Sequence, residues 1–165
     1  MKGHLYEFQT HNTSLFTHII KHERVTRDLN LHVFTAWIEA HKRHDLERML
    51  SCVTDNVKIE SATAGTISGL YQAGEHWQQV FLAFPDLRME PATITADDHR
   101  VVAEVDIEGM NSGSLGKTPA TEKKISLRGA IVVEFDDGKI SGFRIYYDEA
   151  EIGRQLGLKK SLLLG

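Results

Sequence analysis

The chain has 165 residues, of which 41% are hydrophobic and 25% are charged, and its formal net charge is -4 at pH 7. This composition is typical of one soluble globular domain and excludes a fibrous or disordered chain. Because 23 acidic residues outnumber 19 basic ones and no dense basic block occurs, we expect no nucleic-acid partner.

The N-terminal residues 1–26 are predicted to form an arm that carries one short helix. Apolar residues after Thr13 recur on one side of a helix, and Asn12 or Thr13 can cap it. This arm would pack on the body of the protein or on a second subunit. A single domain is predicted over residues 27–158, followed by a C-terminal tail at 159–165.

The first half of the domain is predicted to be mainly helical. Helices are expected at 30–41, 45–51 and 72–84, with a brief strand at 57–60 and a loop at 65–69. The apolar stripe of the first of these helices consists of Leu31, Phe34, Trp37, Ile38 and His41. Such a stripe must cover another part of the protein.

The second half is predicted to consist of strands at 87–96, 101–108, 124–135 and 139–147. The Asp-Gly pair within residues 136–138 indicates a hairpin, because glycine supplies the positive φ that the turn needs. Helices followed by antiparallel strands indicate an α+β fold.

The last strand is apolar on both of its faces. Phe143, Ile145 and Tyr147 point one way, and Arg144, Tyr146 and Asp148 point the other. An antiparallel sheet with one solvated face does not show this pattern. We therefore expect helices to cover one face and a second subunit to cover much of the other, which predicts a homodimer.

Nine histidines are many for this length, and two pairs have helical spacing. His18 with His22, and His41 with His44, could each hold a metal ion. No acidic or cysteine ligand accompanies either pair at a recognisable spacing, so we interpret them as solvated helix histidines and expect no metal site.

The chain is expected to be cytoplasmic. Its N-terminus lacks the cationic start and apolar run of a signal peptide, and no stretch is apolar enough over a sufficient length to cross a membrane. We therefore expect no membrane partner. The single Cys52 cannot form an internal disulfide.

Four segments carry a resemblance to a known family. They are FPDLRME at 84–90, RVVAEVDIEGMNSG at 100–113, KKISLRGAIVVEFDDGKI at 123–140 and YYDEAEIGRQLGL at 146–158. Over about residues 30–158 the chain resembles the SnoaL-like polyketide cyclases, also called ester cyclases, of the nuclear transport factor 2-like superfamily. The resemblance implies a cystatin-like cone, in which a curved antiparallel sheet wraps around a pocket that N-terminal helices close.

The resemblance also implies a catalytic residue. Asp148 matches an aspartate that faces the pocket in the cyclases and acts as general acid/base in an aldol closure, with no metal or organic cofactor. Such a carboxylate could take a proton from carbon and return it to the developing alkoxide. Two other interpretations remain open, because Asp148 could cap the following helix or pair with Arg144 or Arg128.

Six further residues are candidates for contacts with a small-molecule substrate. Their side chains offer hydrogen bonds, charge or apolar surface, and they are Tyr146, Arg128, Arg144, Asn111, Trp37 and His76. For each of them a structural role is the alternative. Arg128 would pair with an internal carboxylate, Trp37 would be core, and His76 would be exposed on its helix.

The chain departs from the family pattern at three positions. Asn111 lies where many ester cyclases have a histidine within a G-T-H-T-G-like stretch, Arg144 replaces a tryptophan, and Leu70 replaces a polar residue. An arginine on the pocket face would suit a small or anionic ligand. Three functions follow. The first is a cofactor-independent enzyme that performs acid/base chemistry on a small carbonyl-rich molecule, and the second is a non-catalytic module that binds a small hydrophobic or anionic ligand. The third is a dimeric interaction protein whose pocket has collapsed.

Overall fold

The computed structural model describes residues 26–61 and 64–158. After a helix that includes residues 26–42, the elements are α2 (Leu46–Ser51), β1 (Val53–Ser61), β2 (Gly65–Ser68), α3 (Leu70–Ala83), β3 (Arg88–Ala96), β4 (Arg100–Met110), β5 (Lys124–Asp136), β6 (Lys139–Tyr147) and α4 (Glu149–Leu156). The predicted arm helix and the C-terminal tail lie outside the described residues.

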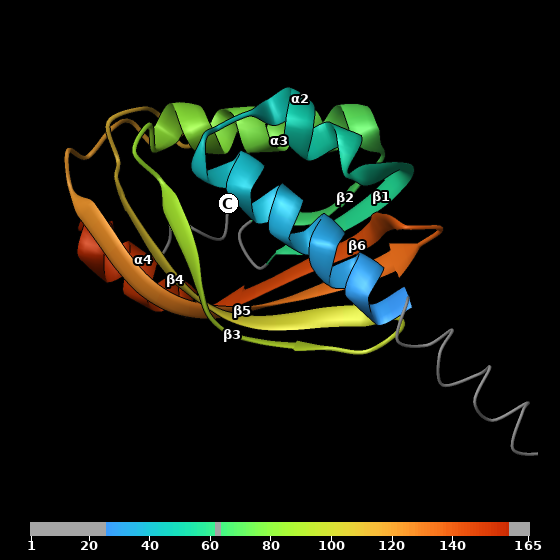
Figure 1. Cartoon of the computed structure of the whole chain (residues 1–165). Coiled ribbons are helices and arrows are strands. Elements are labelled where there is room, and N and C mark those ends of the chain that lie inside the picture. The colour runs from blue at the N-terminus through green and yellow to red at the C-terminus, as the bar shows by residue number, and fades with distance from the viewer. Residues whose placement is uncertain (1–25, 62–63, 159–165) are drawn as a thin grey trace, which may run out of the picture.

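The six strands form one sheet in the order β2-β1-β6-β5-β4-β3. All neighbours are antiparallel except β1 and β6, which pair in parallel. Figure 1 shows the sheet curving beneath the helix at 26–42, α2 and α3. The α+β class predicted from the order of elements and the curved sheet implied by the family resemblance are both confirmed.

Irregular pairing at three points accompanies the curvature. The register shifts between Val53 and Lys58, between Pro91 and Thr93, and after Glu134. Bulges of this kind bend a strand and increase its twist. The sheet therefore presents a concave face to the helices and a convex face on its other side.

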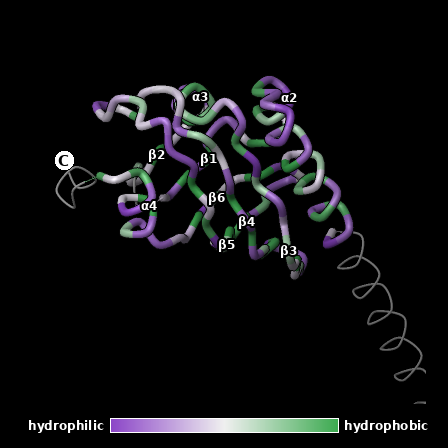
Figure 2. Tube along the Cα trace, turned by 90° about the vertical axis from the view of Figure 1, so that its left-hand side faces the viewer, coloured by the Kyte–Doolittle hydropathy of each residue, from purple (hydrophilic) through white to green (hydrophobic). Residues whose placement is uncertain are grey.

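The alternation predicted for 101–108 appears in β4, where every second residue is buried. Val101, Ala103, Val105 and Ile107 form part of the core between sheet and helices. Figure 2 shows hydrophobic and hydrophilic residues alternating along the strands. One face of β4 is thus apolar, and the residues between these four are exposed.

The predicted hairpin between β5 and β6 is also present. Asp137 has φ 46° and Gly138 has φ 73°, so both residues occupy the left-handed region. A two-residue turn with positive φ at both positions matches the twist of the flanking strands. The Asp-Gly pair therefore fixes the pairing next to the turn, where Asp136 lies opposite Lys139, as far as the register shift after Glu134.

The loop predicted at 65–69 is wrong, because Gly65–Ser68 forms strand β2. It pairs with β1, and Ile67 lies opposite Ile59. Four residues that contain only one large apolar side chain give no measurable alternation, and their pairing with β1 stabilises the strand. In the described ranges, no helix has the length and apolar character needed to span a membrane.

Candidate functional site

A cavity of about 140 Å³ lies between the helices and the sheet. Its walls come from both layers and are mainly apolar side chains: Trp37, His41, Ile59, Ser61, His76, Trp77, Val80, Phe84, Leu87, Met89, Ile107, Leu115, Ile125, Leu127, Phe143, Ile145, Tyr147 and Ile152. The helix at 26–42 and α3 contribute the two tryptophans and two histidines. Strand β6 contributes Phe143, Ile145 and Tyr147, which the sequence pattern had placed together on one face of this strand.

The described lining contains no aspartate, glutamate, lysine or arginine. Its polar side chains are His41, His76, Ser61 and Tyr147, together with the N–H groups of the indoles. A charged ligand that moved from water into this cavity would find no opposite charge among these residues, and its desolvation would cost free energy. The site suits a neutral, mostly apolar molecule.

His41 is the most deeply buried titratable group of the cavity, with 3% of its surface exposed. Burial, and then the nearby charge of His44, lower its pKa from 6.5 to about 4. The ring lies 5.5 Å from Trp37 and 5.2 Å from Phe81 between centroids. At neutral pH the imidazole is uncharged and able to donate one hydrogen bond and accept another.

His76 reaches the same cavity from α3, as the sequence allowed. It is half-buried, and burial lowers its pKa below the usual value. Trp37, which was also predicted to contact a substrate, lines the cavity and is almost wholly buried. These two are the predicted site residues that the structure brings together, and their contacts with a ligand stay predictions.

Asp148 occupies the position expected from its capping alternative. Its carboxylate accepts hydrogen bonds from the backbone N–H groups of Ala150 (2.9 Å) and Glu151 (3.2 Å) at the start of α4. The side chain is 67% exposed and lies 3.9 Å from Arg154. Asp148 is absent from the described lining. Its role as general acid/base stays a prediction, and the geometry corresponds to a helix cap.

Arg144 and Tyr146 were expected on the pocket face, and the structure places them on the opposite face of β6. Together with Glu60 and Thr66 they border a second, open depression, whose lining shares Ser61, Ile145 and Tyr147 with the cavity. Arg144 donates to Glu134 at 2.8 Å. The alternation had grouped these residues correctly, but the larger apolar group of Phe143, Ile145 and Tyr147 faces the helices because that packing buries more apolar surface.

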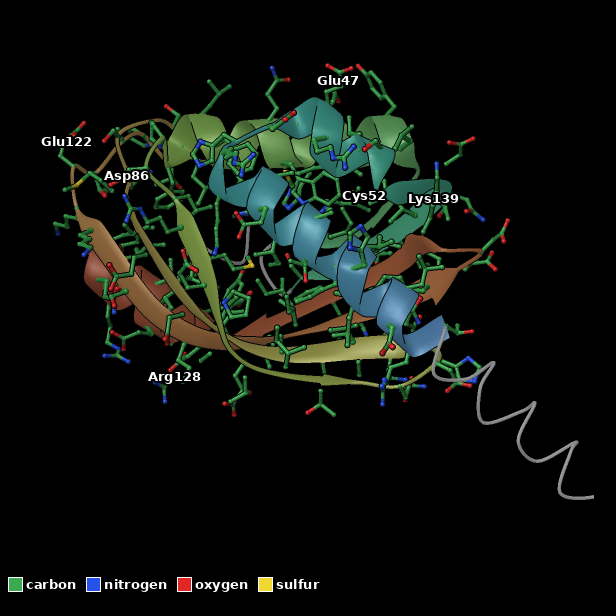
Figure 3. The ribbon with its side chains drawn as sticks, in the orientation of Figure 1. Glu47, Cys52, Asp86, Glu122, Arg128 and Lys139 are labelled. Atoms are coloured by element: carbon green, nitrogen blue, oxygen red, sulfur yellow. The ribbon has the colours of Figure 1, made fainter. Side chains whose placement is uncertain are left out.

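Arg128 also lies on the convex face, away from the helices (Figure 3). Its Nε is 3.3 Å from Asp106 Oδ1, and its side chain is 78% exposed. The carboxylate partner expected from the sequence is present, but the pair is exposed to solvent. In this structure the guanidinium points away from the helices that cover the cavity, and a contact between Arg128 and a ligand stays a prediction.

Asn111 is buried, and its amide is fully used within the protein. Its Nδ2 donates to the carbonyl oxygens of Ala83 and Gly113, and its Oδ1 accepts from both N–H and O–H of Thr121. These bonds attach the loop after β4 to the end of α3. The expected hydrogen bond between Asn111 and a substrate remains untested, and the observed bonds are structural.

Sequence reasoning missed His41 and Tyr147 as site residues. His41 is four residues from Trp37 in the apolar stripe, so the spacing already placed both on one helix face. Tyr147 shares the β6 face of Phe143 and Ile145. The signal was present in both cases, but treating His41 as solvated and choosing the wrong face of the strand concealed it.

Comparison with known proteins finds one family. The family model for the SnoaL-like domain matches residues 34–143. No curated protein matches the chain significantly.

Solved structures with the same architecture are numerous. A Jannaschia sp. CCS1 protein named after the SnoaL-like polyketide cyclases has a TM-score of 0.74 at 14% identity, covering 81% of this chain and 94% of its own. A Xanthomonas campestris pv. campestris protein named after polyketide cyclases gives 0.73 at 21%, covering 79% and 98%. An M. tuberculosis LEH-like epoxide hydrolase gives 0.65 at 17%, covering 79% and 90%. At these identities the likeness shows the fold.

Proposed function

The chain belongs to the SnoaL-like domain family, and from this premise we propose that its cavity binds a small neutral carbonyl compound and moves a proton on it without a cofactor. The observation that carries the proposal is the presence of two neutral histidines in a mainly apolar cavity. Proteins similar in fold bear the names of polyketide cyclases and an epoxide hydrolase, which supports chemistry at an oxygen-bearing carbon.

The size of the cavity limits the ligand. An apolar protein cavity of about 150 Å³ holds a benzene-sized molecule, and this cavity measures about 140 Å³. The site therefore fits a single ring or a short chain, and a fused polycyclic ligand would require the walls to move apart. Its neutral lining favours a carbonyl compound over a carboxylate.

His76 is the better candidate for the proton-transfer group. A general base works best when its pKa lies near the working pH. Burial lowers the pKa of His76, so its ring is uncharged at pH 7 and free to accept a proton. The pKa of His41 is about 4, which makes it a weak base and better suited to hydrogen bonding.

A small cyclic ketone gives a direct test. Cyclohexanone in heavy water exchanges its α-protons when a base removes them, and proton NMR follows the loss of signal. We expect the protein to accelerate this exchange over buffer, and His76→Gln to lower the rate at least about tenfold. His32→Gln, at an exposed position of the helix at 26–42, is the matched control and should retain the rate.

Asp148→Asn separates the two candidate bases. If His76 removes the proton, this variant exchanges cyclohexanone at the unaltered rate, because asparagine also caps a helix. A loss of exchange in Asp148→Asn, with His76→Gln still active, would contradict the assignment and return the role to Asp148.

A non-catalytic binding module is the second candidate. It is favoured by the lack of any carboxylate in the described lining, since carboxylates are frequent general bases. Binding of cyclohexanone without acceleration of its proton exchange would identify this function. Either function uses the same cavity.

We also propose that the convex face of the sheet pairs two copies of the chain. Exposed apolar side chains lie on this side, with Tyr146 55% and Val102 36% exposed. Burying such surface between copies would stabilise a dimer. Sedimentation velocity should give a dimer for the unaltered chain and a monomer for Tyr146→Glu. A monomeric unaltered chain would refute this pairing and leave the cavity unaffected.

A further inference from the structure

We propose that Trp37 and His41 together form a hydrogen-bonding seat for one oxygen of the ligand, which restricts the cavity to neutral molecules that carry a carbonyl or hydroxyl group. This inference rests on the proposed small-molecule function and adds the class of ligand and the residues that select it. The two side chains are called the Trp37–His41 seat below.

The two side chains are neighbours on one helix face. They are four residues apart in the helix at 26–42, and residues at this spacing lie one above the other. Their ring centroids are 5.5 Å apart with an angle of 40° between the planes. Both line the cavity.

Both rings carry a buried nitrogen whose hydrogen bond is missing. Trp37 Nε1 and His41 Nδ1 are each buried and have no hydrogen-bond partner in the described part of the chain. Buried polar groups are nearly always paired, and leaving one unpaired is costly. Two such nitrogens on adjacent side chains of one cavity are expected at a site that a ligand completes.

Comparable side chains nearby lack this feature. The ring of His44 is three residues from His41, and its Nε2 lies 3.1 Å from the carbonyl oxygen of Leu87. The indole nitrogen of Trp77, the second tryptophan of the lining, is not among the buried unpaired atoms found in the described residues. Two other buried atoms of the described residues lack a partner, Thr54 Oγ1 and Glu149 Oε1, and neither residue lines the cavity. Among the described lining residues, the buried unpaired nitrogens are those of the Trp37–His41 seat.

The chemistry of the two nitrogens defines the ligand. An indole N–H only donates, whereas Nδ1 of a neutral imidazole donates in one tautomer and accepts in the other. A carbonyl oxygen would accept from both groups. A hydroxyl oxygen would accept from Trp37 while its proton is donated to His41. The same seat thus accommodates a ketone and the enol that forms when it loses an α-proton.

Charge excludes a second class of ligand. His41 is uncharged at neutral pH, and no lysine or arginine occurs in the described lining. A carboxylate or phosphate bound here would have hydrogen bonds but no opposite charge, and its desolvation would be uncompensated. The Trp37–His41 seat therefore selects neutral oxygen over anionic oxygen.

The test uses phenol, toluene and benzoate, which share a ring and differ in their polar group. The chain contains two tryptophans, so protein labelled with 15N at tryptophan gives two indole signals, and Trp77→Phe leaves only that of Trp37. We expect phenol to bind and to move the Trp37 indole proton downfield. Toluene should bind more weakly without this movement, and benzoate should not bind.

Trp37→Phe and Trp77→Phe are matched variants of one cavity. Loss of one hydrogen bond should lower the affinity for phenol about fivefold to tenfold in Trp37→Phe and leave the affinity for toluene unchanged. Trp77→Phe should affect both probes alike. If Trp37→Phe does not fold, the indole signal in the Trp77→Phe protein still decides, because its failure to move with bound phenol overturns the Trp37–His41 seat.

The outcomes separate the Trp37–His41 seat from the proposed function. Equal binding of phenol and toluene, with cyclohexanone still exchanging its protons, overturns the seat alone. Preference for phenol through Trp37 without any proton exchange supports the seat and refutes the enzyme. Tight binding of benzoate overturns the neutral-ligand class.

Discussion

The two faces of the sheet differ in their charged side chains. The concave face and the helices above it enclose a cavity whose described lining has no ionised side chain at neutral pH. The convex face carries ion pairs across neighbouring strands, including Arg128 with Asp106, Lys124 with Glu108 and Arg144 with Glu134. Function is therefore expected from the face that excludes charge.

This difference arises from single-residue alternation. In β6, Ile145 faces the cavity, and its neighbours Arg144 and Tyr146 border the depression on the other face. Alternation in a strand states which residues share a face, but it does not state which face the helices cover. Packing determines which face the helices cover, because burying the more apolar set of side chains removes more apolar surface from water.

The largest effect is expected when a charge enters the concave face. Ile131 is fully buried in β5, between Ala103 and Ile145 in the register. Ile131→Asp would bury a carboxylate without a partner, so we expect it to lower the free energy of unfolding by at least about 4 kcal/mol. Urea denaturation measures this loss.

Val132→Asp is the matched control on the convex face. Val132 is half-buried and lies opposite Arg144 in the register, so the new carboxylate would have a cation nearby. Both aspartate variants are compared in the Tyr146→Glu background, in which the proposed pairing of two copies is absent. There Val132→Asp should change the free energy of unfolding by no more than about 1 kcal/mol. Equal losses in the two variants would show that the faces do not differ in the proposed way.

As the pH falls, the free energy of unfolding should decrease first because of His41, which lines the cavity. Unfolded His41 takes up a proton near pH 6.5, whereas folded His41 does so only near pH 4. The unfolded state therefore binds more protons between these values, and stability falls as the pH falls through this window. The shift corresponds to about 3 kcal/mol. Denaturation midpoints at a series of pH values measure it.

His41→Phe removes this titration and should flatten the slope. A smaller slope of the same sign remains, because burial also lowers the pKa of His76. The convex face responds at lower pH. The hydrogen bonds from Arg144 to Glu134 and from Lys124 to Glu108 lower the pKa values of these carboxyls below 4.5. The contribution of these two carboxyls to stability is present above pH 4.5 and is lost as they are protonated.

An unchanged slope of stability against pH in His41→Phe would contradict the assignment of the pH dependence to His41.

Much of the fold was predictable from local patterns. The long strands β4, β5 and β6 follow from alternation, and their hairpin follows from Asp137 and Gly138, because these signals reside in the segments themselves. Strand β2 was missed, because its pairing with β1 stabilises it, and the local preference of its four residues for a strand is too weak to predict one. The parallel pairing of β1 with β6 also depends on the whole chain.

The site was less predictable than the fold. The sequence placed Trp37 and His41 on one helix stripe, yet a histidine among charged neighbours looked solvated. Only the packing of Phe81 and Trp37 against its ring shows the burial that lowers its pKa. For Asp148 the residues Glu149 and Ala150 already suggested a cap, and the family resemblance favoured catalysis. The structure shows the capping hydrogen bonds, and the catalytic role of Asp148 stays a prediction.

Asp148 should affect stability at the edge of the structure rather than chemistry in the cavity. Asp148→Ala removes the two hydrogen bonds to the first turn of α4 and should lower the free energy of unfolding by about 1 kcal/mol, whereas Asp148→Asn should cost less. Urea denaturation compares the variants. A stable Asp148→Ala protein that no longer exchanges the protons of cyclohexanone would contradict the capping interpretation.

Arg128 should give the smallest effect of the four. Its pair with Asp106 is exposed on the convex face, and exposed ion pairs contribute little because water and salt screen them. Arg128→Gln should change the free energy of unfolding by less than about 0.5 kcal/mol, with an even smaller difference at high salt. Urea denaturation at low and high salt measures both values. The variant should also exchange cyclohexanone protons at the unaltered rate, because its guanidinium lies on the opposite side of β5 from the cavity. A loss of exchange without a loss of stability would show that the convex face takes part in ligand binding, and the separation of a charged outer face from a neutral functional face would then fail.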